Sequence, residues 1–148
     1  MSDLFSDIEK STSTKGTQEE SLGLKLSKPE EMWDVADPAK QILIVEDNKY
    51  SAYALMSLLE QHALGVHLAM NGKEAADLVK LRNEKLGETY KLIITDLYSS
   101  ECDGFEGVKM IKEYVNSQSN LRTMPYICLL SCNDSESCKK KALELGID

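Results

Sequence analysis

The chain has 148 residues, of which 42% are hydrophobic and 28% are charged, and its formal net charge is −8 at pH 7. This length and composition predict one domain with some additional chain rather than two domains. The acidic balance leaves no basic surface to neutralise nucleic-acid phosphates or anionic lipid, so we expect no nucleic-acid binding and no membrane contact by this chain.

Residues 1–39 are rich in Ser, Thr, Lys, Asp and Glu and show no sustained apolar period. This composition predicts a disordered acidic tail or linker, followed by an ordered domain over residues 40–148. The tail starts without the basic and apolar stretches of a signal peptide, and no run in the chain is long enough to cross a membrane. We therefore expect a cytoplasmic protein.

The rest of the chain alternates between apolar runs and helical periods, which is typical of a repeated strand–helix unit. The expected elements, in chain order, are a strand over 41–45, a helix with its apolar stripe at 52–59, a strand over 65–69, a helix over 73–86, a strand over 91–95, a helix with its stripe at 105–115, a strand over 125–130 and a helix over about 135–145. Right-handed crossovers make such strands parallel and place helices on both faces, which predicts an α/β doubly wound sheet.

Polar residues follow three of the predicted strands at the end where an open parallel sheet places its ligand site. Glu46 and Asp47 follow the first strand, Asp96 follows the third and Ser131 follows the fourth. Any one of them could simply cap a helix. Together, three carboxylates repel one another and favour a bound cation, and hard oxygen ligands suit Mg²⁺. Asp96 is then a candidate phosphoryl acceptor, with Ser131 placed to hydrogen-bond a phosphoryl oxygen.

These residues resemble the motifs of response-regulator receiver domains of two-component phosphorelays. The matching segments keep the order of the family and are residues 42–48, residues 69–76, Asp96 followed by Asp103 and Gly104, and residues 125–131. The resemblance implies a flavodoxin-like (CheY-like) sheet with strand order 2-1-3-4-5. It also implies that Asp96 receives a phosphoryl group from a phosphohistidine on a histidine kinase or a histidine phosphotransfer protein.

The same resemblance implies a role for each residue of the site. Asp47 and Asp96 would ligate Mg²⁺ directly, Tyr98 would add its backbone carbonyl, and Glu46 would act through water. Ser131 would be the switch hydroxyl, which binds the phosphoryl group once it has arrived and so changes a partner-binding surface. Such a chain is an acceptor domain rather than an enzyme, and it could be part of a hybrid histidine kinase.

The sequence departs from the receiver pattern in two places. Ser100 stands where receivers usually have a proline. The chain also ends at Asp148, before the fifth strand and fifth helix of the family, so no residue corresponds to the phosphate-binding lysine of that strand. We therefore expect a sheet that is incomplete at its C-terminus, with the strand over 125–130 left as an edge and apolar surface uncovered beside the first helix.

Two other interpretations stay open. A receiver-like interaction module could bind partners without being phosphorylated, which the missing lysine and the altered loop favour. A phosphatase or nucleotide-binding protein on a similar sheet is less well supported. Tyr98 stands where aspartyl phosphatases place a second aspartate, two residues after Asp96, and no glycine-rich phosphate loop follows the first strand.

Overall fold

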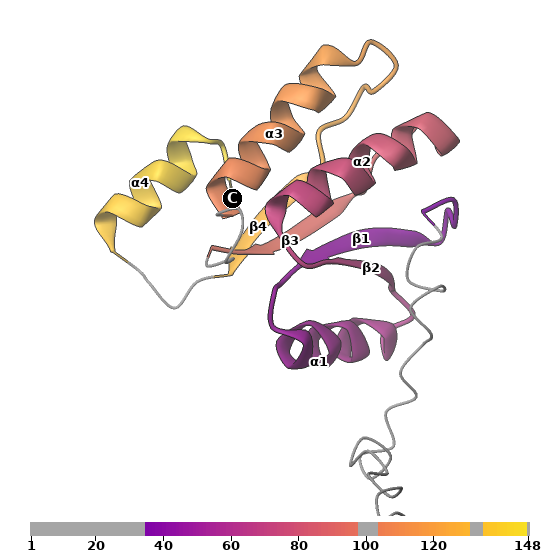
Figure 1. The fold of residues 1–148 in the computed structure, drawn as a ribbon, viewed down its shortest axis with the longest axis horizontal. Helices are drawn as coiled ribbons and strands as arrows, with labels where there is room; N and C mark the ends of the chain where they lie inside the picture. Colours follow the sequence, from indigo (N-terminus) through magenta and orange to yellow (C-terminus); the bar gives the residue numbers. More distant parts are fainter. Residues whose placement is uncertain (1–34, 98–103, 131–134, 148) are drawn as a thin grey trace, which may run out of the picture.

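The computed structural model describes residues 35–97, 104–130 and 135–147, and these residues form one parallel sheet with helices packed on both faces (Figure 1). The elements, in chain order, are β1 (Lys40–Val45), α1 (Lys49–Glu60), β2 (Gly65–Ala69), α2 (Gly72–Leu86), β3 (Leu92–Asp96), α3 (Gly104–Ser117), β4 (Tyr126–Leu130) and α4 (Glu136–Glu144). The strand–helix alternation predicted from the apolar runs is therefore confirmed.

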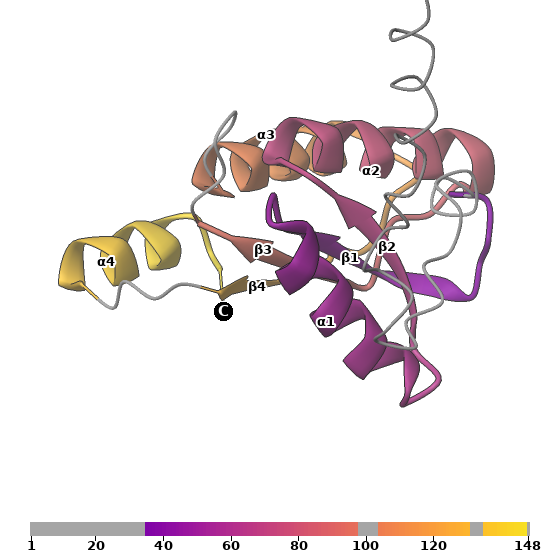
Figure 2. The ribbon, with the colours of Figure 1, turned by 60° about the horizontal axis from the view of Figure 1, so that its bottom comes forward.

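The strand order in the sheet is β2-β1-β3-β4, and every neighbouring pair is parallel. This order confirms the predicted doubly wound α/β sheet, and it matches the first four strands of the flavodoxin-like order. Figure 2 shows α2 and α3 over one face of the sheet and α1 over the other. The strand order reverses between β1 and β3, and because these two strands are parallel their carboxyl ends lie at the same edge of the sheet.

Side-chain caps start the helices where the sequence places Asn and Ser. Asn48 accepts hydrogen bonds from the backbone N–H groups of Tyr50 and Ser51 at the start of α1. Asn71 accepts one from Glu74 at the start of α2, and Ser135 accepts one from Cys138 at the start of α4. Each cap satisfies a backbone donor that the first helical turn leaves unpaired.

The two faces of the sheet carry separate cores. The larger core lies under α2 and α3 and includes Leu43, Ile93 and Ile111, all at most 2% exposed. The smaller core lies under α1 and includes Ile44 and Met56. β1 contributes to both, which explains why its sequence is a continuous apolar run rather than an alternating one.

The outer strand β4 differs from β1 because one of its faces is largely open. Tyr126 is 73% exposed and Leu130 is 44% exposed, and Cys128 between them is exposed as well. Their partners on β3 in the parallel register include Leu92 and Ile94, which pack toward the α1 core. The expected position of this strand at the border of the four-stranded sheet is therefore confirmed, and the face of β4 that is turned toward the α1 side leaves large apolar side chains exposed.

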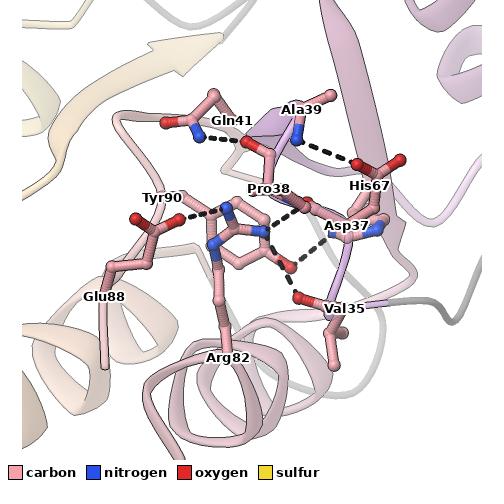
Figure 3. Close-up of polar contacts among 9 residues, drawn as sticks. All are labelled: Val35, Asp37, Pro38, Ala39, Gln41, His67, Arg82, Glu88 and Tyr90. Carbon is pink, nitrogen blue, oxygen red and sulfur yellow. Dashed lines mark hydrogen bonds and ion pairs between the residues drawn. The ribbon is translucent and has the colours of Figure 1, made fainter. Parts of the chain in front are cut away.

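A buried arginine fixes the segment that precedes β1 (Figure 3). The Arg82 side chain on α2 is 0% exposed and forms an ion pair of 2.7 Å with Glu88. Its other terminal nitrogen donates to the carbonyl oxygens of Val35 at 3.4 Å and Asp37 at 3.2 Å. Val35 is itself 0% exposed within the larger core, although it precedes the predicted start of the domain.

The Arg82 guanidinium also lies over the ring of Tyr90, 4.8 Å from its centroid, where a cation is attracted to the π-electrons. The Tyr90 hydroxyl shares a hydrogen bond of 2.8 Å with Nδ1 of His67 on β2. Burial raises the pKa of Tyr90 to about 12, although nearby Arg82 lowers it, so the phenol stays protonated at neutral pH. The cluster joins α2, β2 and the entrance to β3.

Replacing Arg82 with methionine should lower the free energy of unfolding by about 2–3 kcal/mol, because the change breaks a buried ion pair and its hydrogen bonds. The loss stays moderate because the carboxylate of Glu88 is half-exposed and can be hydrated by water instead. The matched control is Lys80→Met on the same helix, which removes an exposed pair with Asp77 and should cost at most about 0.5 kcal/mol. Urea unfolding midpoints measure both. Equal losses in the two variants would contradict a structural role for the buried guanidinium.

Candidate functional site

The register between β1 and β3 brings the predicted acidic residues to one edge of the sheet. Val45 pairs with Thr95, so Glu46 and Asp47 leave β1 beside the point where Asp96 ends β3. The neighbouring strands end at the same level, because the Glu46 N–H donates to the Ala69 carbonyl at 3.0 Å. All three carboxylate residues are partly exposed, so this edge is open to ions and partners.

The carboxyl group of Glu46 is affected both by burial and by its acidic neighbours. Partial burial raises the pKa of the Glu46 carboxyl, and the charges of Asp96 and Asp47 raise it further. A hydrogen bond of 3.0 Å from the Asn48 N–H to the Glu46 carboxylate acts in the opposite direction. The structure therefore brings Glu46, Asp47 and Asp96 into one electrostatic cluster, and a cation would relieve the repulsion among them.

Asn48 fixes the loop that carries two of these carboxylates. Its side chain accepts hydrogen bonds from Tyr50 at 3.0 Å and Ser51 at 3.2 Å, while its own N–H is bonded to Glu46. The loop from β1 into α1 is thus held at both ends by a single residue. Its short length leaves Asp47 little freedom to move away from the strand edge.

Gly104 and Thr95 shape the surroundings of Asp96, and sequence reasoning assigned neither of them to the site. A Cβ atom at Gly104 would lie 2.4 Å from the Asp96 carbonyl oxygen, so only glycine permits this approach of α3 to the end of β3. The Thr95 hydroxyl donates to the same carbonyl at 3.2 Å. In the sequence, the one sign of this close approach is the glycine at position 104, at the end of the loop that follows the third strand.

Two predicted site residues lie outside the described part of the chain. Ser131 follows β4 directly, and the Leu97 N–H donates to the Leu130 carbonyl at 3.3 Å, but Ser131 and Tyr98 are not described. Ser100 and Asp103 fall outside it too. The roles expected of Ser131 as switch hydroxyl and of Tyr98 as a carbonyl ligand therefore stay predictions.

Within 35–97, 104–130 and 135–147, no three His, Cys, Asp or Glu side chains converge as a ready metal-binding group. This does not conflict with the electrostatic cluster, because charges act over longer distances than coordination bonds. Any ion at this edge would use fewer direct carboxylates and complete its shell with carbonyl oxygen and water.

None of the described helices has the length and apolar character needed to cross a membrane.

Comparison with protein families gives one match that covers most of the chain. The model described as "Response regulator receiver domain" matches residues 42–148. The match includes Glu46, Asp47 and Asp96, and it begins within β1.

Curated relatives include histidine kinases far longer than this chain. Hybrid signal transduction histidine kinase B of Dictyostelium discoideum is 31% identical over 121 residues, which are 76% of this chain and 6% of the kinase. Probable histidine kinase 1 of Oryza sativa subsp. indica is 34% identical over 77 residues, which are 52% of this chain and 7% of that kinase. The chain thus spans less than a tenth of either relative.

Solved structures with the same fold include two receiver domains. The Saccharomyces cerevisiae Ssk1 receiver domain, crystallised with the histidine phosphotransfer protein Ypd1, has a TM-score of 0.62 and 29% identity, covering 75% of this chain and 76% of the other. The receiver domain of the Arabidopsis thaliana histidine kinase CKI1, crystallised with Mg²⁺ and BeF₃⁻, has a TM-score of 0.63 and 26% identity, covering 74% and 77%.

Glu46→Gln should change how stability depends on pH in metal-free buffer. The native protein holds this proton more tightly than the unfolded chain, because its pKa is raised from the ordinary 4.5. The stability gained from the proton is therefore fully present below that ordinary value and is lost as pH rises through the raised native value. As pH rises from the ordinary value through the raised native value, the melting temperature of the variant should therefore increase relative to that of the parent.

Glu84→Gln, a change on the exposed surface of α2, is the reference for the loss of one negative charge. The same pH series is recorded for it by thermal unfolding with a chelator present. If Glu46→Gln and Glu84→Gln gave parallel curves, repulsion within the acidic cluster would be too weak to matter.

Proposed function

The chain belongs to the response regulator receiver domain family, and on that premise we propose that Asp96 accepts a phosphoryl group from a phosphohistidine. The observation that supports this most directly is the meeting of Asp96, at the carboxyl end of β3, with Glu46 and Asp47, at the end of β1. An exposed carboxylate at this edge of an open parallel sheet is accessible to a second protein.

The proposed transfer moves one phosphoryl group between two proteins. A carboxylate oxygen of Asp96 forms a bond to phosphorus while the phosphorus–nitrogen bond of the donor histidine breaks. The leaving imidazole takes up a proton, and Asp96 becomes an acyl phosphate. The acidic side chains of Glu46 and Asp47 lie beside it, and a cation would offset their repulsion of the incoming group.

The donor set of the site fits Mg²⁺ in its chemistry. Asp47 and Asp96 would supply carboxylate oxygen directly, Glu46 would supply it through water, and the backbone of Tyr98 would supply a carbonyl. When bound, the ion offsets the negative charge that spreads over the transferred phosphoryl oxygens. The similar CKI1 receiver domain, which was crystallised with Mg²⁺ and BeF₃⁻, supports this assignment.

The phosphodonor is proposed to be a histidine kinase or a histidine phosphotransfer protein. Support comes from the similar Ssk1 receiver domain, which was crystallised with such a transfer protein, and from the histidine kinases among the relatives. In this proposal the chain is an acceptor without turnover of its own, and Ser131 would bind the phosphoryl group and change a partner-binding surface. The chain could equally be one part of a hybrid kinase.

A second candidate is a receiver-like interaction module that binds partners without being phosphorylated. The observation that favours it is the lack of three converging metal ligands within the described residues. The two candidates agree on the fold and the partner class, and they differ only in whether Asp96 forms an acyl phosphate.

Incubation with acetyl phosphate and Mg²⁺ should add one phosphoryl group to the chain, because this small donor replaces the phosphohistidine. Asp96→Asn should abolish the addition, and Asp47→Asn should slow it about tenfold or more by removing a direct ligand. Asp77→Asn, an exposed change on α2, is the control. Mass spectrometry measures incorporation and its loss at alkaline pH. No incorporation in the parent chain would favour the interaction module.

Gly104→Ala should slow phosphorylation more than its loss of stability explains, because the new methyl group would displace the Asp96 carbonyl. A small displacement at a reacting group lowers the reaction rate by about tenfold or more. Gly107→Ala is the matched control, since its Cβ would lie 2.5 Å from Gly72 Cα, between α2 and α3. Both variants should lose stability, and only Gly104→Ala should slow the reaction. Equal rates in the two folded variants would contradict this role.

A further inference from the structure

A groove lies at the end of the sheet opposite Asp96. It has a cavity volume of about 370 Å³ and is bordered by the starts of β1 and β4 and by the connections that lead into β3 and β4. We call it the amino-terminal groove, and its defining residues are Gln41, Glu88, Lys91, Arg122, Met124 and Tyr126.

The amino-terminal groove combines positive charge with exposed apolar surface. Lys91 and Arg122 are exposed, and neither has an ion-pair partner within the part of the chain that the structure describes. Met124 is 37% exposed and Tyr126 is 73% exposed. Two exposed cations beside two large apolar side chains fit a segment that carries carboxylates next to large apolar groups.

The chain enters the domain beside this groove. Figure 3 shows the Arg82 guanidinium holding the Val35 carbonyl on one side and the Glu88 carboxylate on the other. The side-chain amide of Gln41 donates to the Pro38 carbonyl. Because Glu88 and Gln41 both line the groove, the residues just before β1 are anchored to its border.

The segment immediately upstream has the complementary chemistry. Residues 30–33 read Glu-Glu-Met-Trp and precede Val35 by two to five positions. They lie outside the described residues. A fully extended chain covers at most about 3.5 Å per residue, so a segment of five residues before Val35 can reach no farther than roughly 17 Å from it.

We propose that residues 30–33 dock in the amino-terminal groove, with Glu30 and Glu31 facing Lys91 and Arg122, and Met32 and Trp33 covering Met124 and Tyr126. A tryptophan side chain buries up to about 250 Å² and is therefore the main apolar anchor. The anchored Val35 holds the segment at an effective concentration in the millimolar range, so an intramolecular occupant outcompetes a second copy at ordinary concentrations.

Trp33 makes the proposal measurable because it is the only tryptophan in the chain. Acrylamide quenching of its fluorescence in the full chain should be weaker than quenching of N-acetyltryptophanamide. Lys91→Glu with Arg122→Glu should remove this protection, and Glu30→Lys with Glu31→Lys should do the same. All four changes together should restore it, because the opposite charges then face each other again.

Lys73→Glu is the control, since it reverses an exposed charge at the first turn of α2. It should leave quenching unchanged, and circular dichroism of every variant checks that the domain is folded. Native quenching equal to that of the free amide, or no recovery in the fourfold variant, would overturn the proposal. Protection that appears only as protein concentration rises would also overturn it, because the occupant would then be a second copy.

Discussion

The parallel register between β1 and β3 is the constraint on which the rest of the structure depends. Val45 lies opposite Thr95, so the residues that follow both strands leave the sheet at the same edge. Three acidic residues meet there, and partial burial together with the charges of Asp96 and Asp47 raises the pKa of Glu46. A shift of one residue would turn every side chain of one strand to the other face and would move Asp96 away from its place beside Glu46 and Asp47.

The packing of α3 against β3 and α2 positions the backbone around Asp96. α3 begins at Gly104, in contact with the Asp96 carbonyl, and crosses α2 closely where Gly107 meets Gly72. Both approaches need a residue without a side chain. The face covered by α1 is less complete, since Tyr126 and Leu130 on β4 stay exposed. The face under α2 and α3 is therefore the better covered one, and the outer strand β4 is the less protected part of the sheet.

Much of this arrangement could be predicted because it follows from local patterns. Continuous apolar runs indicated the strands, and acidic residues directly after two of them indicated the cluster. The role of Arg82 could not be predicted, because a single arginine in an amphipathic helix is typical of a solvent-facing position. Its burial depends on the carbonyls of Val35 and Asp37, more than forty residues away along the chain. Contacts of this range leave no periodic signal in the sequence.

β3 connects the two ends of the domain, with Tyr90 and Lys91 before it and Asp96 at its end. Its central residues are buried between both cores, so packing holds the strand on both of its faces. Coupling between distant sites requires an element with two states. A segment docked beside Lys91 would therefore strengthen the attachment of β3 and raise stability, while the geometry around Asp96 would stay the same. The acidic cluster and the amino-terminal groove then share a scaffold without sharing a switch.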